Sequence, residues 1–406
     1  MAGPLSHIRV LDLSRIMAGP WAGQILADLG ADVVKVERPG AGDDTRGWGP
    51  PFLKDKSGRD TRDAGYFLVV NRGKRSIAVD LADAEGQRIV HALAARADIV
   101  LENFKAGTLA KFGLGYDHLA AANTGLIYCS ITGFGLSGPR RDQAAYDFMI
   151  QGMSGLMSVT GEADGKPGGG PQKVGVPIVD IMTGMYAAIA VLAALARREH
   201  SGQGEHIDIG MLDVGVSFLA NQAMNYLISG KAPRRGGNAH PNIQPQDVFA
   251  ARDGHLVLAV GNDEQFARFC EVLERPDLAA DERFKANAGR VRNSAVLTAL
   301  IAETLATRER DHWVSACARA GVPCGPINTI PEVFTDPQVV HRGMLTEIAH
   351  ALAGAVPQVA SPMRFANAPL AHERPPPLLG EHTEEILREL GWPNASEHAV
   401  AGTDEK

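Results

Sequence analysis

The sequence predicts an α/β protein of two lobes, the larger one built on a mostly parallel sheet covered by helices. Its 406 residues exceed the length at which a single hydrophobic core stops growing. A hydrophobic content of 45% with 21% charged residues is typical of a folded chain and excludes a disordered one. Strand and helix signals alternate through residues 1–130, as in βαβ units that bind ligands at the carboxyl ends of their strands.

The elements of the larger lobe follow in order from these signals. Residues 8–13 form an apolar run typical of a strand, and Pro20 stands near the start of a helix that ends before Gly30. The same alternation predicts strands at 32–36, 76–79, 99–102 and 126–131, and a helix at 84–97.

Residues 174–196 contain Asp180 as their only charged side chain. Pro177, Thr183 and Gly184 interrupt the first half, which leaves too short a segment to cross a bilayer, so we expect a buried helix and no membrane association. Later signals predict strands at 205–210, 255–259 and 325–330, an extended segment at 374–379, and helices to about 227 and at 263–273, 294–306, 311–320 and 383–390.

Composition shifts at residues 231–246, a basic stretch rich in glycine and proline. We therefore predict a large lobe over 1–224, a small α/β lobe over 225–330, and a return segment over 331–406 that packs on the large lobe and ends in a loose tail from about 395. The loops 38–71 and 161–173 are too long for plain connectors and are expected to be functional or mobile.

Charge and cysteine usage exclude several classes of function. A net charge of -7 argues against a broad nucleic-acid surface. The four cysteines form no CxxC pair, which predicts reduced thiols. The N-terminal residues show no basic region followed by an apolar run, as a secretory signal would, so we expect a cytoplasmic location. The thirteen histidines show no metal-ligand spacing, so no metal site is expected.

Basic residues gather between Lys35 and Arg75, where ten lysines and arginines face six acidic residues, a local charge of +4. Composition alone favours a solvated charged loop. The alternative is a phosphate site, because Arg38 and Lys74 stand at strand ends. The first turn, Ser14 to Pro20, lacks the GxGxxG glycines, so side chains would have to hold such a phosphate.

Two further residues carry competing interpretations. Spacing alone favours Asp180 as a helix N-cap, yet an acid among apolar residues after a glycine-rich loop also suits a desolvated nucleophile. His240, in the stretch Gly236 to Pro241, is equally an ordinary loop residue or a functional one.

Several motifs, in the same order over residues 6–392, resemble the class III (CaiB/BaiF) CoA-transferases: VLDLSRIMAGPWAGQILADLGADVVKVERPGAGDDTRGWGPPF, NRGKRSIAVDL, LENFKAG, YCSITGFGLSGP, VPIVDIMTGMYA and RPPPLLGEHT. Within that family the likeness is greatest to succinate:hydroxymethylglutarate CoA-transferases. The resemblance implies a Rossmann-like large lobe and a smaller α/β lobe in ring-shaped subunits that interlock as a homodimer.

The resemblance also implies residue roles. Asp180, followed by Ile181, Met182, Thr183 and Gly184, takes the position of the family's nucleophile. CoA contacts carry over to Arg15, Met17, Ala18, Arg38, Asn71, Lys74, Asn103, Phe104, Lys105, Lys111 and Phe112. Substrate contacts carry over to Tyr146, Gly237, Asn238 and His240, the last three in the family's loop over the site.

The implied reaction moves CoA from an acyl-CoA donor such as succinyl-CoA to a carboxylic acid through aspartyl anhydride and aspartyl-CoA thioester intermediates. CoA is then a substrate, and no cofactor is bound permanently. The chain departs from family patterns at Thr132, where formyl-CoA transferases have lysine, and at Gln244-Pro245-Gln246, where relatives often have Val-Pro-Tyr.

Two alternatives stay open at this point. An α-methylacyl-CoA racemase shares the fold but uses a His-Asp pair, where this chain has Tyr146-Asp147, and an unperturbed tyrosine pKa near 10 makes it a poor replacement. A CoA-binding protein without turnover is the other alternative, and the presence of Asp180 argues against it.

Overall fold

The computed structural model describes residues 3–370 and 373–393, which fall into two units. Unit 1 comprises Met1–Leu156, Val174–Ala220 and Pro337–Lys406, and unit 2 comprises Met157–Lys173 and Asn221–Asp336. The glycine-rich loop 161–173, which the sequence analysis counted in the large lobe, groups with unit 2. The tail expected from about 395 lies outside the described residues.

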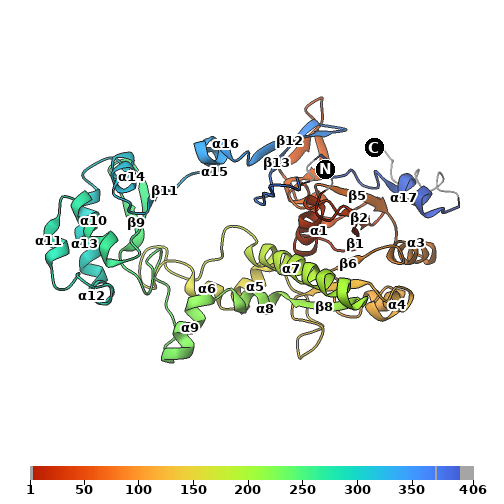
Figure 1. Ribbon diagram of the computed structural model, residues 1–406, viewed down its shortest axis with the longest axis horizontal. Coiled ribbons are helices and arrows are strands. Elements are labelled where there is room, and N and C mark those ends of the chain that lie inside the picture. Colours follow the sequence, from red (N-terminus) through yellow and green to blue (C-terminus); the bar gives the residue numbers. More distant parts are fainter. Residues whose placement is uncertain (1–2, 371–372, 394–406) are drawn as a thin grey trace. The chain divides into compact units, whose positions relative to one another are not determined.

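Unit 1 is built on a six-stranded sheet in the order β5-β2-β1-β6-β7-β8, and every neighbouring pair is parallel (Figure 1). Chain order reverses between β1 and β6, as in a doubly wound sheet. The α/β fold class with a parallel sheet is thus confirmed. The six strands are β1 (Arg9–Asp12), β2 (Asp32–Glu37), β5 (Lys74–Ala78), β6 (Ile99–Glu102), β7 (Ile127–Thr132) and β8 (Glu205–Gly210).

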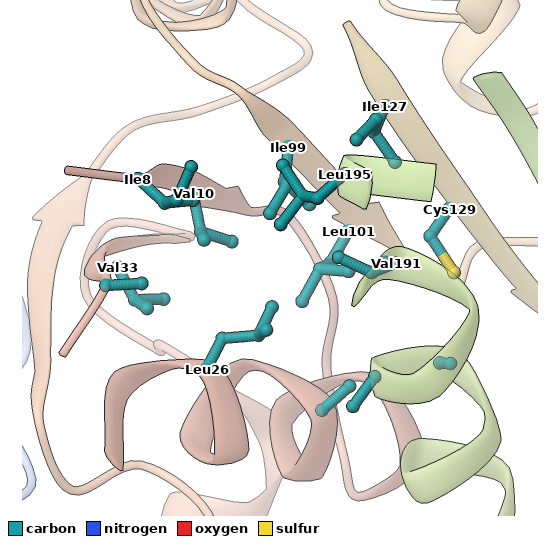
Figure 2. Packing of buried hydrophobic residues seen from close by; sticks show 14 of the residues in the cluster. Ile8, Val10, Leu26, Val33, Ile99, Leu101, Ile127, Cys129, Val191 and Leu195 are labelled. Carbon is teal, nitrogen blue, oxygen red and sulfur yellow. The ribbon is translucent and has the colours of Figure 1, made fainter. Parts of the chain in front are cut away.

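Alternate residues of these strands belong to two separate hydrophobic cores. On one face, Leu26 of α1 (Ala18–Asp28) and Val191 and Leu195 of α7 (Ile178–Ser201) point toward Val10 and Leu101 (Figure 2). On the other, α3 (Ala84–Ala94) and α17 (Thr383–Leu390) cover the sheet. Burial on both faces explains the apolar stretches of β6 and β7, whereas β5 (KRSIA) and β8 (EHIDIG) are half polar or more.

Helix α7 is long and apolar enough, by length and composition, to pass for a membrane span. Its inward residues, among them Ala187 and Val191, are buried in the core against α1 and the sheet. Gly184 permits this approach, because a Cβ there would lie 2.6 Å from the Ala18 carbonyl oxygen. Core packing therefore accounts for much of the apolar character that the sequence shows.

The remaining elements of unit 1 lie in its loops and return segment. The loop 38–71, expected to be functional or mobile, is largely structured as a short helix and a hairpin that the sequence did not predict. A second hairpin, over residues 345–359, was also missed. The elements of unit 1 that have not yet been named are η1 (Asp44–Gly47), β3 (Phe52–Lys54), β4 (Asp60–Ala64), α2 (Gly65–Leu68), η2 (Leu109–Phe112), α4 (Tyr116–Ala122), α5 (Asp147–Met153), α8 (Met211–Ser217), α16 (Pro337–His341), β12 (Leu345–His350) and β13 (Gly354–Val359).

Unit 2 has its own core, where Phe249, Leu256, Phe269, Ile301 and Trp313 pack between a three-stranded antiparallel sheet and helices. The sheet has the order β11-β10-β9. Its elements, with α6 and α9 at the boundaries with unit 1, are α6 (Leu156–Val159), α9 (Ala220–Ser229), β9 (Gln246–Ala250), β10 (His255–Ala259), α10 (Asp263–Val272), α11 (Pro276–Ala280), α12 (Asn287–Arg292), α13 (Ser294–Leu305), α14 (Arg310–Arg319), β11 (Cys324–Pro326) and α15 (Ile330–Thr335).

The predicted helix to about 227 is two helices, α8 and α9. The helical conformation is interrupted between them, and Ala220 has a φ of 45°. The strand predicted over 325–330 shortens to Cys324–Pro326. The segment 374–379 forms no strand but lies next to the sheet edge, where Pro377 accepts a hydrogen bond from Arg46.

Candidate active site

The turns after β1 and β6 are joined at the point where strand order reverses. Asn103 accepts a hydrogen bond from the Arg15 backbone N–H at 2.8 Å and donates one to the Arg15 carbonyl at 2.6 Å. Ile16, beside them, has a φ of 70°, which is rare for a β-branched residue. Such a held, strained turn is typical of a ligand-binding position, and reversal points are where doubly wound sheets bind ligands.

A cleft of about 380 Å³ opens at this point, and we call it the Asp180 cleft. Its walls come from the turns after β1, β6 and β7 and from the segment that leads into α5. The lining residues are Arg15, Ile16, Ala18, Asn103, Phe104, Lys105, Thr108, Ile131, Thr132, Gly133, Arg141, Gln143, Ala144, Ala145, Tyr146, Asp180 and Met211.

A second cleft of about 250 Å³, the Arg38 cleft, shares Arg15 and Phe104 with the first. The Arg15 guanidinium lies 5.4 Å from the centre of the Phe104 ring, so this pair stands between the two clefts. Its lining residues are Leu13, Arg15, Lys35, Val36, Glu37, Arg38, Gly42, Asp43, Asp44, Val79, Asp80, Leu81, Ala82, Phe104 and Phe112.

Asp180 lies in the first turn of α7 and is not its N-cap, so the interpretation that spacing favoured was wrong. The N-cap position belongs to Pro177, which has no side-chain cap. Asp147, at the start of α5, performs the capping: its Oδ1 accepts from the backbone N–H groups of Val179 at 2.8 Å and Asp180 at 3.2 Å. The Asp180 carboxylate is left to face the cleft.

Asp147 is itself held in place by Gln151, one turn further along α5. Gln151 donates to Asp147 Oδ2 at 2.6 Å, and its amide oxygen accepts from the Val174 N–H at 2.9 Å. Both side chains are buried. Local sequence does not predict this role for Asp147, because an acid at a helix start ordinarily caps the helix that follows it, whereas Asp147 begins α5 and caps α7.

The pKa of Asp180 is raised to about 7, chiefly by burial and further by the negative charge of Asp147. Both effects disfavour the carboxylate relative to the neutral acid. A partly desolvated carboxyl with a pKa near neutrality, in a cleft, is the usual signature of a functional group.

The predicted CoA-contact residues do not all reach the clefts. Arg15, Ala18, Asn103, Phe104 and Lys105 line the Asp180 cleft, as does Tyr146, and Arg38 and Phe112 line the other. Met17 is buried behind the first turn, and exposed Lys111 lines neither cleft.

Asn71 and Lys74 are fully buried below the clefts. Lys74 Nζ donates to Asp12 at 2.8 Å, to the Pro20 carbonyl at 2.9 Å and to Asn71 Oδ1 at 3.0 Å. Burial lowers the pKa of Lys74 to about 8, while Asp12 opposes that effect. Both side chains make their hydrogen bonds inside the protein, beneath the first turn, and their contact with CoA stays a prediction.

The basic excess between Lys35 and Arg75 is divided between the interior and an exposed loop. Exposed cations of the loop are Lys54, Lys56, Arg59 and Arg62. The other group is buried and paired with carboxylates: Lys35 with Asp43, Arg46 with Glu37 and Asp63, Arg72 with Asp28, Lys74 with Asp12, and Arg75 with Asp32, Glu385 and Glu389. Arg38 is exposed in its cleft and makes no ion pair within the described ranges.

Gly237, Asn238 and His240 belong to unit 2, whereas Asp180 belongs to unit 1. The Gly237 N–H donates to the Gly161 carbonyl at 3.1 Å, so this connector contacts the glycine-rich loop. His240 Nδ1 accepts from the N–H groups of Asn242 and Ile243, both at 3.1 Å. One ring nitrogen of His240 therefore supports the local turn.

Within residues 3–370 and 373–393, no group of three or more His, Cys, Asp or Glu side chains is placed to hold a metal ion. A cavity of about 400 Å³ at the amino ends of the strands is lined by Arg75 and by Asp32 and Glu389, which both pair with Arg75. The Asp180 cleft is therefore the stronger candidate for chemistry.

Known proteins resemble this chain along nearly its whole length. The model of CoA-transferase family III matches residues 5–383. The succinate–glutarate CoA-transferase of Agrobacterium fabrum is 51% identical over 388 residues, which cover 95% of this chain and 96% of that protein. The human succinyl-CoA:glutarate CoA-transferase is 41% identical over 387 residues, 95% of this chain and 86% of that one. A crystal structure of a CaiB/BaiF family protein from Brucella suis superposes with a TM-score of 0.85, at 50% identity, over 96% of this chain and 100% of that one.

Proposed function

This chain belongs to CoA-transferase family III, and on that premise we propose that it moves CoA from succinyl-CoA to a short dicarboxylic acid, with Asp180 as the nucleophile. CoA enters as a substrate thioester. The observation that carries the proposal is the Asp180 carboxyl, presented by the first turn of α7 to a cleft at the strand-order reversal, with a pKa of about 7.

The first half of the reaction transfers the acyl group to the enzyme. A carboxylate oxygen of Asp180 attacks the thioester carbonyl carbon, and the carbon–sulfur bond breaks to give an aspartyl–acyl anhydride and CoA thiolate. The thiolate then attacks the aspartyl carbonyl, which releases the donor carboxylate and leaves an aspartyl-CoA thioester. The second half reverses these steps: the acceptor carboxylate displaces the thiolate, and the thiolate then attacks the acceptor acyl carbon to free Asp180.

Two features suit CoA to the adjoining clefts. Arg38, unpaired by any acid among the described residues, supplies positive charge for nucleotide phosphates, whereas Arg15 at the edge of its cleft pairs with Asp44 at 2.9 Å. The pantetheine arm would pass the Phe104 ring to reach Asp180. Partial burial of Asp180 helps such chemistry, because water would hydrolyse the anhydride.

Asp180→Asn tests the nucleophile. The amide keeps the shape of the side chain but does not form the anhydride, so transfer should fall by about a thousandfold or more while the Kd for CoA stays within about threefold. Transfer is followed by mass spectrometry of acyl-CoA products, and CoA binding by calorimetry. The matched control is Asp311→Asn, an exposed acid of α14 outside both clefts, which should keep full activity. Normal turnover in Asp180→Asn would refute the mechanism.

Arg141 supports a dicarboxylate as substrate, because it is one of three cations that line the Asp180 cleft, with Arg15 and Lys105. A second carboxylate on the acyl chain would be a partner for it. The related proteins act, by their names, on succinate and glutarate.

A screen of acyl-CoA donors against carboxylic acids, read by mass spectrometry, tests this substrate class. Arg141→Gln should raise KM for succinyl-CoA by about tenfold and leave KM for acetyl-CoA within about twofold, because only the former has a second carboxylate. Arg140→Gln is the matched control, since Arg140 lies over Phe134 and outside the cleft. Equal losses for both donors would contradict this role.

A further inference from the structure

Glu102 is a buried acid at the end of an otherwise apolar strand. Glu102 is the last residue of β6, and 6% of its surface is exposed. The next three residues, Asn103, Phe104 and Lys105, line the Asp180 cleft. Glu102 Oε2 accepts a hydrogen bond from the Phe104 backbone N–H at 2.8 Å. The carboxyl therefore fastens the loop 103–105 to the sheet.

A polar chain leads from this carboxyl to a partly exposed histidine. Ser130 is the register partner of Glu102 on β7, and its hydroxyl favours the ionised carboxylate. Ser130 Oγ also lies 3.0 Å from His206 Nε2 on β8. Because Thr132 and Gly133 line the same cleft, the chain runs beneath two of its walls.

The histidine at the end of the chain is fixed by aromatic rings. Its ring stacks on Tyr116 with centres 4.5 Å apart and meets Tyr128 edge-on at 5.4 Å. Burial lowers the pKa of His206, although Asp208, Asp117 and Glu205 oppose the effect. The imidazole is therefore mainly neutral at pH 7 and can either donate or accept at Nε2.

No cation offsets the charge of Glu102 among the described residues that influence it. Burial raises the pKa of Glu102 to about 7, and the hydrogen bonds from Ser130 and Phe104 only partly reverse that rise. The charge of Glu102 also acts on Tyr128 and Cys129 of β7. Burial and this charge raise the pKa values of both side chains, so both stay neutral. Glu102 thus changes charge near neutral pH.

We infer that Glu102 is a positioning residue that makes CoA affinity depend on pH by holding the loop 103–105 through its hydrogen-bonded chain with Ser130 and His206. The inference rests on the proposed function, because it takes the Asp180 cleft as the CoA site.

The two protonation states hold the loop with different strength. The ionised carboxylate accepts from both Phe104 N–H and Ser130 O–H, and Ser130 Oγ then accepts from His206 Nε2–H. When a proton binds Glu102, its O–H donates to Ser130, whose own proton turns toward His206 Nε2. A charged acceptor forms a stronger bond than a neutral one, so the loop is held more firmly above pH 7.

Glu102→Gln separates this role from simple packing. Glutamine keeps the shape, accepts from Phe104 and donates to Ser130, so it copies the protonated state at every pH. The Kd for CoA is measured by calorimetry from pH 5.5 to 8.5 in both proteins, and titration of CoA itself cancels in their ratio. We expect the ratio of variant to wild type to be near one at pH 5.5 and to rise to roughly fivefold at pH 8.5, with a midpoint near 7.

Ser130→Ala is the second variant. Because the Ser130 hydroxyl lowers the pKa of Glu102, its removal should move the midpoint to higher pH. A ratio for Glu102→Gln that does not change with pH would overturn the inference while leaving the proposed function intact. Failure of the wild type to bind CoA would instead overturn the proposed function. Should Glu102→Gln not fold, the Kd ratio of Ser130→Ala to wild type takes its place: a ratio that is constant from pH 5.5 to 8.5 would refute the inference, and a ratio that changes near pH 7 would support it.

Discussion

Asp180 owes its free carboxylate to a second acid that is remote in sequence. Asp147 takes the backbone N–H groups of Val179 and Asp180, which an N-terminal helical acid would otherwise compete for. The same residue raises the pKa of Asp180 by its charge. One carboxylate thus positions the helix start and also weakens the acidity of the other.

The pH dependence of transfer follows from that arrangement. In the proposed mechanism Asp180 attacks as the carboxylate, so kcat/KM should fall about tenfold per pH unit below pH 7 and level off above it. Asp147→Asn can still accept the two N–H bonds but carries no charge, so the inflection should move to lower pH. The measurement is kcat/KM from pH 5 to 9 in both proteins. An inflection that stays in place would mean that burial alone sets the pKa.

At the scale of elements, prediction from sequence succeeded where local pattern and tertiary burial coincide. β6, β8, β10 and α17 have the predicted bounds, because their apolar spacing is also their packing. The β3–β4 hairpin was missed, since its second strand, Asp60–Ala64, is mostly polar and shows no alternation. α8 and α9 were merged because the break at Ala220 involves a residue that ordinarily favours helix.

The docking of α17 depends on one buried guanidinium. Arg75 of β5 contacts Asp32 at 2.5 Å, Glu385 at 2.9 Å and Glu389 at 2.8 Å, and these acids are themselves partly exposed. Arg75→Met should lower the free energy of opening of α17 by about 1–3 kcal/mol, a discounted value because solvent screens the acids. Hydrogen exchange of residues 383–390 measures this loss of protection.

Arg388→Met is the matched control for α17. Within the part of the chain that the structure describes, Arg388 pairs only with exposed Glu384 on the same helix, so its loss should cost less than about 0.5 kcal/mol. Equal protection of α17 in the two variants would show that apolar packing of Ile386 and Leu387 suffices to hold the helix.

At the scale of the whole molecule, unit 1 exposes several large apolar side chains close to the proposed nucleophile. Met185, Tyr186 and Ile189 lie on α7, and Tyr146 and Phe148 lie at the start of α5. Contiguous apolar patches on a protein surface mark interaction sites. We propose that a second copy of the chain covers them, in the interlocked homodimer that the family resemblance implies.

Ile189→Glu tests that assembly. Ile189 is 60% exposed, so a charge there costs little in a free chain but would be desolvated in an interface. Sedimentation should show a wild-type dimer and a variant shifted toward monomer by about tenfold or more in Kd. Val296→Glu, at an exposed valine of α13 in unit 2, is the control and should stay dimeric. A wild-type monomer would end the dimer proposal.

The sequence by itself determined the α/β class, most strands of the parallel sheet, the family and the position of Asp180, because each is written in local patterns or ordered motifs. Only the tertiary structure decided which charged residues are free to act. Buried cations between Lys35 and Arg75 pair with carboxylates that are remote in sequence, as Arg75 does with Glu389. Asp147 likewise accepts a hydrogen bond from the distant backbone N–H of Asp180 at the start of α7. Ion pairing and desolvation depend on distance and burial in space, which spacing along the chain does not specify.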